Sequence, residues 1–165
     1  MNLDFSERYA ARPLTASDAD VILTLCAENE QFYRYHPPLA TKESVLEDLS
    51  ALPPGKNAAD KHYLGFFDGK TLVAVLDLIL DYPQEGTAYL GFFMTKKATQ
   101  GRGIGSALIG ELLDELRKAS CKKVRLAVDR GNPQSKAFWE KNGFALTGEE
   151  FTNGDSASLP MESAL

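Results

Sequence analysis

The chain contains 165 residues, of which 44% are hydrophobic and 25% charged, and its net charge is −5. This size and balance are typical of one globular domain over residues 1–165, with a core that needs no disulfide or metal for stability. The acidic balance argues against a nucleic-acid partner, which requires a basic face, and it is compatible with a cationic small molecule.

The sequence lacks the features of exported, membrane-bound or metal-binding proteins. Its N-terminal segment contains no apolar run of a signal peptide, and no stretch approaches the roughly 20 apolar residues of a membrane span. Cys26 and Cys121 do not form a Cys-x-x-Cys pair. We therefore expect a cytoplasmic protein with no membrane partner and no metal site.

The N-terminal half is predicted to begin with a short strand, two helices and a hairpin. Thr15 and Thr41 are suitable helix N-caps, and each precedes apolar residues at helical spacing. Asp68 and Gly69 form a common turn pair, and the run that follows, TLVAVLDLIL, is rich in β-branched and aliphatic residues. The predicted elements are a strand over 8–13, helices over 15–29 and 41–52, and strands over 62–68 and 70–81.

The C-terminal half alternates strands with helices. Apolar residues at i, i+4, i+8, i+9 and i+12 from Ile104 give one stripe of an amphipathic helix. Pro133 near the start and Asn142-Gly143 at the end delimit a second helix. The predicted elements are strands over 87–95, 122–128 and 144–151, helices over 103–120 and 133–142, and a last short strand near Met161. This order predicts an α/β domain with a mixed sheet, in which residues 87–128 form a parallel strand–helix–strand unit.

The most informative segment is Gln100 to Ser106, between a predicted strand and the clearest predicted helix. Its three alternating glycines allow a tight turn that side chains would obstruct. The free N–H groups at the start of the helix, together with the helix dipole, then form an anion site suited to a pyrophosphate. Arg102 adds a positive charge at the rim.

Several explanations of this glycine-rich turn compete. A mononucleotide P-loop is excluded because Gly105-Ser106 stands where Lys-Ser/Thr is required. The glycine spacing does not fit a dinucleotide motif, although Asp129 partly meets the expectation of an acidic residue after the next strand. A dinucleotide site and a turn without ligand therefore both stay open at this point.

Two segments resemble a known family. Gln100 to Gly105 matches the acyl-CoA motif Gln/Arg-x-x-Gly-x-Gly/Ala of the GNAT superfamily of N-acetyltransferases. Asn132 to Phe144 resembles the second signature of that family, and Met161-Glu162 resembles its final strand. The resemblance covers residues 62–162 well and the first sixty residues loosely.

The resemblance implies a mostly antiparallel mixed sheet with a splayed central parallel strand pair, helices on both faces, and acetyl-CoA as co-substrate. The pantetheine arm is expected to lie between the splayed strands, and the pyrophosphate to contact the glycine-rich turn. The coenzyme-binding residues implied in this way are Phe93, Met94, Thr95, Gln100, Gly101, Arg102, Gly103, Ile104, Gly105, Ser106, Asn132, Ser135, Lys136 and Trp139.

The residues for proton transfer depart from the family pattern. Trp139 occupies the position where many members carry a tyrosine acid, and an indole cannot act as a general acid near neutral pH. Either another tyrosine substitutes, with Tyr89 as candidate, or protonation of the leaving group is not limiting. Asp77 is the leading candidate base because it interrupts an apolar run, where a carboxylate must be paired or face a cavity. The other candidate bases are Asp81, Glu85, Glu30 and His36.

The resemblance implies that the segment from Glu30 to His36 borders the acceptor pocket. Its aromatic residues suit recognition of an amine by cation–π contacts, so Glu30, Tyr33 and His36 are candidate substrate-binding residues. The simpler alternative is that Phe32 and Tyr33 cover the edge of the sheet.

The resemblance therefore implies an N-acetyltransferase, and we expect it to act on a primary amine of a small molecule by direct attack in a ternary complex. Three other functions stay open: a protein or peptide N-acetyltransferase, a non-catalytic CoA-binding module, and a nucleotide-binding domain. Dimers are common in the family that the chain resembles, and a homodimer is compatible with this sequence without being specified by it.

Overall fold

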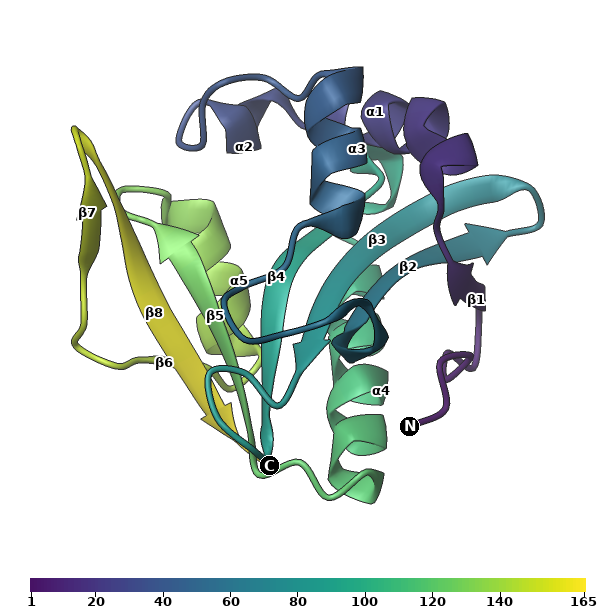
Figure 1. Cartoon of the computed structure of the whole chain (residues 1–165). Coiled ribbons are helices and arrows are strands. Elements are labelled where there is room, and N and C mark those ends of the chain that lie inside the picture. The colour runs from purple at the N-terminus through teal and green to yellow at the C-terminus, as the bar shows by residue number, and fades with distance from the viewer.

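The computed structural model describes all residues 1–165 and is built on one eight-stranded sheet in the order β1-β2-β3-β4-β5-β8-β6, with β7 paired to β8 (Figure 1). The strands are β1 (Ala10–Pro13), β2 (Lys61–Asp68), β3 (Thr71–Leu80), β4 (Thr87–Thr95), β5 (Lys123–Asp129), β6 (Ala145–Leu146), β7 (Phe151–Asn153) and β8 (Ser156–Ala164). The helices are α1 (Ala19–Ala27), α2 (Glu30–Tyr33), α3 (Lys42–Ser50), α4 (Ile104–Lys118) and α5 (Pro133–Lys141), with short 3-10 turns at Ala16–Asp18, Ala58–Asp60 and Lys97–Thr99.

All strand pairs are antiparallel except β4 and β5, which confirms the predicted mixed sheet. The parallel pairing joins residues 87–90 of β4 to residues 123–126 of β5 and ends there. Beyond Leu90, β4 stays paired with β3, and beyond Leu126, β5 stays paired with β8. The two strands therefore diverge as the sheet is followed away from the C-terminus (Figure 1).

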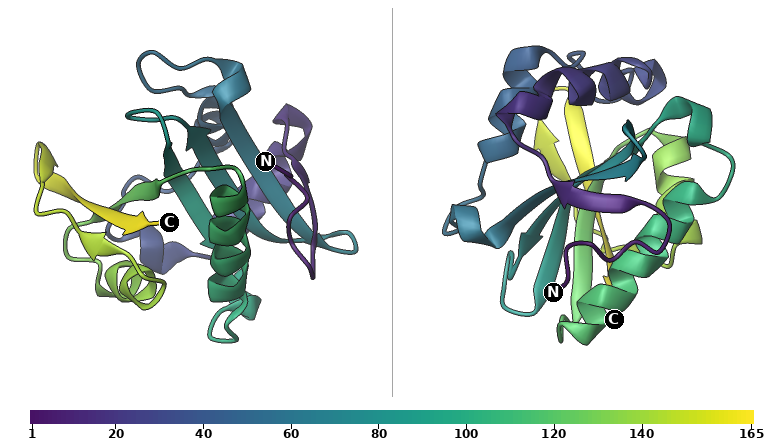
Figure 2. Two further views of the ribbon diagram at one scale, coloured as in Figure 1. Left: turned by 90° about the horizontal axis from the view of Figure 1, so that it is seen from below. Right: turned by 90° about the vertical axis from the view of Figure 1, so that its right-hand side faces the viewer.

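Helices cover both faces of the sheet, as predicted. Leu108, Leu112 and Leu116 of α4 are buried in one apolar cluster with residues of the central strands. A second cluster on the other face joins Ile22 of α1 and Val45 of α3 to the sheet. Figure 2 (right) shows α4 and α3 on opposite sides of the strands. No helix in the chain has both the length and the apolar character needed to cross a bilayer.

Three predicted elements are wrong in their extent. The strand expected over 144–151 is broken after β6, because Gly148 takes a left-handed φ of 89° and Thr147 bonds to Glu149 within the turn. The strand expected to be short near Met161 is the nine-residue β8, which pairs along all of β5. The helix expected over 15–29 is divided into a 3-10 turn and α1, and α2 follows Asn29, whose backbone leaves the helical region.

A β-bulge in β4 lies where the parallel pairing ends. Asp77 faces Phe92 and Leu78 faces Leu90, so Gly91 is the extra residue of β4. A Cβ atom at Gly91 would lie 2.9 Å from Oδ2 of Asp77, the oxygen that receives a 2.8 Å ion pair from Lys61. Glycine is therefore required by the close approach of the Asp77 carboxylate.

We predict that Gly91→Ala destabilises the protein by about 1–3 kcal/mol, because the new methyl group must displace a carboxylate that Lys61 holds in place. Gly110→Ala is the matched control, since Gly110 is helical and a Cβ there meets nothing within 4 Å. This control should be neutral or stabilising by about 0.5–1 kcal/mol. Urea denaturation midpoints measure both; equal midpoints for the two variants would show that the Asp77 carboxylate moves freely.

Candidate functional site

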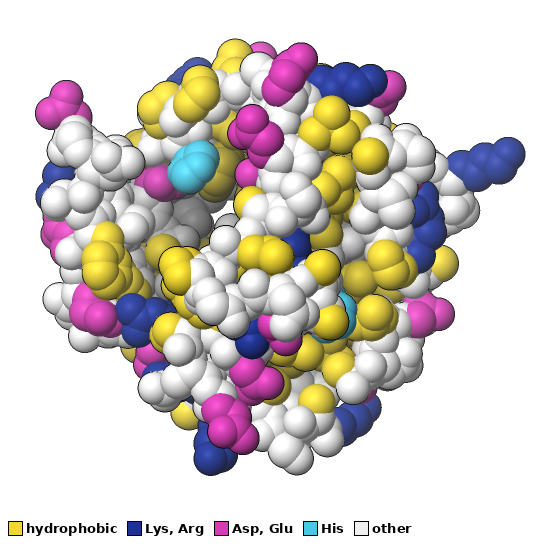
Figure 3. Space-filling view, in the orientation of Figure 1, with side chains coloured by type: hydrophobic (Ala, Val, Ile, Leu, Met, Phe, Trp, Pro, Cys, Tyr) yellow, Lys and Arg dark blue, Asp and Glu magenta, His cyan; other side chains and the backbone are white.

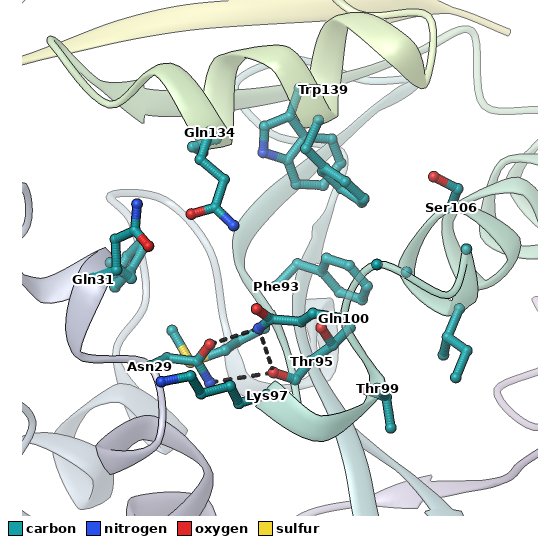
Figure 4. A pocket seen from close by; sticks show the side chains of 18 of the residues that line it. Asn29, Gln31, Phe93, Thr95, Lys97, Thr99, Gln100, Ser106, Gln134 and Trp139 are labelled. Carbon is teal, nitrogen blue, oxygen red and sulfur yellow. Dashed lines mark hydrogen bonds between the residues drawn. The ribbon is translucent and has the colours of Figure 1, made fainter.

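A cavity of about 390 Å³ lies where β4 ends and α4 begins. It is also bordered by α5 and by the junction of α1 with α2 (Figure 4). The lining residues are Glu28, Asn29, Gln31, Phe32, Phe93, Met94, Thr95, Lys97, Thr99, Gln100, Gly101, Gly103, Ile104, Gly105, Ser106, Asn132, Gln134, Ser135, Phe138, Trp139 and Lys141.

Most of the coenzyme-binding residues expected from sequence meet at this cavity. Arg102 and Lys136 are the exceptions, because neither lines it. Lys136 instead forms an ion pair with Glu140, one helical turn further along α5. The positive side chains at the cavity are Lys97 and Lys141, which the sequence motifs did not indicate.

The N-terminus of α4 opens into the cavity without a side-chain cap. Gly103 is the N-cap residue with φ of 77°, and Gly101 has φ of 74°, a region that favours glycine. A Cβ at either position would meet nothing within 4 Å, so the turn leaves open space above the helix end. Helix α5 differs, because Asn132 Oδ1 accepts a 3.1 Å bond from the Ser135 N–H. The first N–H groups of α4 thus stay available to an anion.

An aromatic wall borders the cavity beside the end of β4. The Phe93 ring stacks on Phe138 at 6.1 Å between centroids and meets Trp139 edge-on at 6.0 Å. Trp139 also packs edge-on against Phe144 and is only 7% exposed. Trp139 is therefore both a core residue and part of the wall, and no polar contact singles it out for proton transfer.

Several lining residues were missed by sequence reasoning. Phe138 lies within the second family signature and had a usable signal there. Asn29, Gln31 and Phe32 line the cavity because α1 breaks before the expected end of its helix and α2 turns across the end of β4. No spacing in the sequence indicated that approach.

Asp77 and Tyr89, the candidate catalytic residues, do not line the cavity. Asp77 points to the face that carries α1 and α3, where its side chain is 14% exposed and its Oδ1 is buried without a hydrogen-bond partner. Burial raises the pKa of Asp77, and Lys61 partly opposes that shift. Burial also raises the pKa of Tyr89, whose ring meets that of Tyr82 edge-on at 5.5 Å.

The segment after α1 reaches across to β5 on the Asp77 face. His36 Nδ1 lies 3.0 Å from Oδ1 of Asp129, the last residue of β5, and this hydrogen bond raises the pKa of His36. The His36 ring lies 5.2 Å from Phe32, which in turn meets Phe92 of β4 at 6.1 Å. His36 and Phe32 therefore bridge the two diverging strands.

The other acceptor and base candidates are spread more widely. Tyr33 packs on the α1–α3 core cluster, and burial raises the pKa of its hydroxyl, so it is mainly structural here. Glu30 is exposed in the first turn of α2. Asp81 accepts a 2.7 Å bond from the Gly86 N–H within the loop after β3, and Glu85 belongs to the same loop.

Comparisons with known proteins agree with this geometry. The sequence profile of the acetyltransferase (GNAT) family matches residues 24–144. No curated protein has a significant sequence match to the chain. The mostly antiparallel sheet also lacks the parallel strand order of a dinucleotide-binding domain.

Solved structures of several acetyltransferases share the fold. The PaiA N-acetyltransferase of Thermoplasma acidophilum in complex with coenzyme A has a TM-score of 0.71 at 22% identity, covering 95% of this chain and 99% of that one. A chimera of the spermidine N-acetyltransferase SpeG from Vibrio cholerae and hSSAT has a TM-score of 0.72 at 22% identity, covering 96% of both. The ribosomal-protein-S18-alanine N-acetyltransferase of Escherichia coli has a TM-score of 0.68 at 16% identity, covering 94% of this chain and 93% of that one.

These likenesses establish the fold, and the family match extends from α1 to the end of the second signature. The motif at Gln100 to Gly105 and the splayed strands lie within the matched residues. The chain therefore belongs to the acetyltransferase (GNAT) family, whose members are acetyl-CoA-dependent N-acetyltransferases.

Proposed function

We propose that residues 1–165 form one N-acetyltransferase domain that moves the acetyl group of acetyl-CoA to a primary amine of a small molecule. The observation that carries the proposal is the meeting of an unpaired strand edge and an uncapped helix N-terminus in one cavity. An extended arm ending in phosphates matches this pair of features, because the edge offers backbone partners and the helix end attracts negative charge.

The coenzyme side of the proposal uses the lining residues directly. The pyrophosphate contacts the N–H groups of residues 101–106, with Lys97 and Lys141 as nearby positive charges. The pantetheine arm lies along residues 93–95 of β4, whose neighbour β5 has already diverged. The rings of Phe93, Phe138 and Trp139 keep water from that arm.

In this proposal the acceptor enters from the face of the sheet that carries α1 and α3. Figure 3 shows a hollow on that face. In the same orientation, Figure 1 shows the segment between α3 and β2 crossing in front of the strands. Asp77 and Asp129 belong to this side, as does Asp48, whose pKa burial raises while the charges of Lys61 and His36 oppose that shift. Carboxylates around a hollow attract a cationic amine, and a bordered hollow favours a small molecule over an extended peptide.

The reaction forms a bond from the amine nitrogen to the acetyl carbon and breaks the bond from that carbon to sulfur. The amine must first lose a proton, and the raised pKa of Asp77 makes this carboxylate a better proton acceptor than an exposed aspartate. A backbone N–H near Phe93 or Met94 is suited to the developing oxyanion. Tyr89 keeps its proton because its pKa is raised, so its role is that of a donor.

The first test concerns the coenzyme site. We predict that Gly103→Glu abolishes the thermal stabilisation by acetyl-CoA, because a carboxylate then occupies the anion site at the α4 N-terminus. A ligand at 100 times its Kd should stabilise the unmodified protein by about 2.7 kcal/mol. Gly154→Glu is the control, since Gly154 also has a positive φ and open space around it but lies in the β7–β8 turn. An equal acetyl-CoA response in both variants would place the pyrophosphate elsewhere.

A second test concerns the bridge between the diverging strands. We expect His36 to titrate above the ordinary histidine pKa of about 6.5 and His62, whose pKa burial lowers, to titrate below it. The stability that the His36–Asp129 pair contributes is then fully present below about pH 6.5 and is lost as the pH rises through the raised pKa of His36. NMR titration of both histidines measures this; Asp129→Asn should lower the pKa of His36 and leave that of His62 unchanged.

A third test concerns the proton acceptor. Thiol release from acetyl-CoA over a panel of small amines and short peptides should show turnover with small primary amines. We predict that Asp77→Asn lowers kcat by about 100-fold or more, because the amide cannot take the proton. Asp18→Asn is matched to it, since Asp18 is 12% exposed and ion-paired to Arg12 at 2.7 Å, and it is not among the residues that line the cavity. Full turnover in Asp77→Asn would remove Asp77 from the chemistry, and turnover only with peptides would favour a peptide acetyltransferase.

A further inference from the structure

The carbonyl of Thr95 at the end of β4 is held by two side-chain amides. Asn29 Nδ2 donates to it at 3.2 Å, and Gln100 Nε2 donates to it at 3.1 Å (Figure 4). The two amides also bond to each other, because Gln100 Nε2 donates to Asn29 Oδ1 at 2.6 Å. Asn29 just after α1, which is 66 positions from Thr95 in sequence, therefore meets the end of β4 and the start of the glycine-rich turn at one oxygen.

The direction of this carbonyl explains why the contact matters. The Lys96 N–H donates to the Val73 carbonyl of β3 at 2.8 Å, so the polar backbone groups of Lys96 face β3. Because these groups alternate along a strand, those of Thr95 face the other edge, which β5 has left. The two amides take the place of a neighbouring strand for the Thr95 carbonyl and leave the Thr95 N–H as the group that this residue offers to an incoming arm.

Asn29 is suited to this position by its full set of partners. Its Nδ2 donates to the Leu25 carbonyl at 2.9 Å as well as to Thr95, and its Oδ1 accepts from Gln100. Although Asn29 is the N-cap residue of α2, its side chain makes no capping bond there. Capping of α2 therefore does not account for the asparagine. Its Nδ2 satisfies a carbonyl in the last turn of α1, and its contacts with Thr95 and Gln100 use both polar atoms of its side chain.

We infer that Asn29 is a positioning residue for the coenzyme, acting through Thr95 and Gln100. It fixes the end of β4 against the turn at 101–106, so that the strand edge and the helix N–H groups are held at one separation. Two binding regions at a fixed separation bind one ligand more tightly than two regions that move independently. The inference rests on the coenzyme site of the proposed function and assigns Asn29 a task that the family motifs do not contain.

The test measures CoA binding by calorimetry for the wild-type chain, Asn29→Ala, Gln100→Ala and the double variant. We expect each single variant to weaken CoA binding about tenfold, equivalent to about 1.4 kcal/mol. The KM for acetyl-CoA should rise by a similar factor while kcat changes by less than about twofold, because Asn29 does not touch the reacting atoms. Asn57→Ala is the control, since Asn57 also makes a side-chain hydrogen bond, to the Ala59 N–H, but lies outside the cavity.

The double variant separates positioning from direct contact. If Asn29 acts through Gln100, the double variant binds CoA about as weakly as the weaker single variant; additive losses would mean that Asn29 contacts the ligand itself and would overturn the inference. CoA affinity in Asn29→Ala equal to that of wild type would also overturn it, while leaving the coenzyme site intact. Absence of CoA binding by the wild-type chain would overturn the proposed function and this inference with it. Should Asn29→Ala fail to fold, Gln100→Ala removes the same contact from the other side.

Discussion

The early end of the parallel pairing between β4 and β5 is the constraint on which the rest of the site depends. Each strand is held along its outer edge by an antiparallel neighbour, β3 for β4 and β8 for β5, so the sheet is two half-sheets joined over four residue pairs. The bulge at Gly91 lies just beyond the last pair and adds local twist. The divergence therefore follows from hydrogen-bond register, and an exposed strand edge is its direct result.

An unpaired strand edge is usually a liability, because it invites pairing with another chain. Here the edge is enclosed by the start of α4, the rings of Phe138 and Trp139, and the junction of α1 with α2. The Thr95 carbonyl is satisfied by amide side chains. The enclosure restricts what can pair with β4 to something narrow and extended, which is the chemical description of a pantetheine arm.

The sequence predicted the parts of this site that depend on local pattern, and it failed where distant segments meet. The apolar stripe of α4, the bounds of β4 at Thr87–Thr95 and the glycine-rich turn all leave signals within a few residues. The contact of Asn29 with Gln100 spans 71 positions and that of His36 with Asp129 spans 93. Such contacts are fixed by packing of α1 and α2 on the sheet, so neither periodicity nor spacing contains them. Gly148 was the exception, because its left-handed turn had a local cause that the strand pattern concealed.

The junction of α1 with α2 connects the two sides of the sheet more closely than either motif suggests. Asn29 bonds to the end of β4 and to the glycine-rich turn, and Phe32 both lines the cavity and packs between His36 and Phe92. A shift of this short segment must therefore change the coenzyme cavity and the bridge to β5 together. Substitutions within residues 29–36 are constrained by the hydrogen bonds of Asn29, which join this segment to Leu25, Thr95 and Gln100.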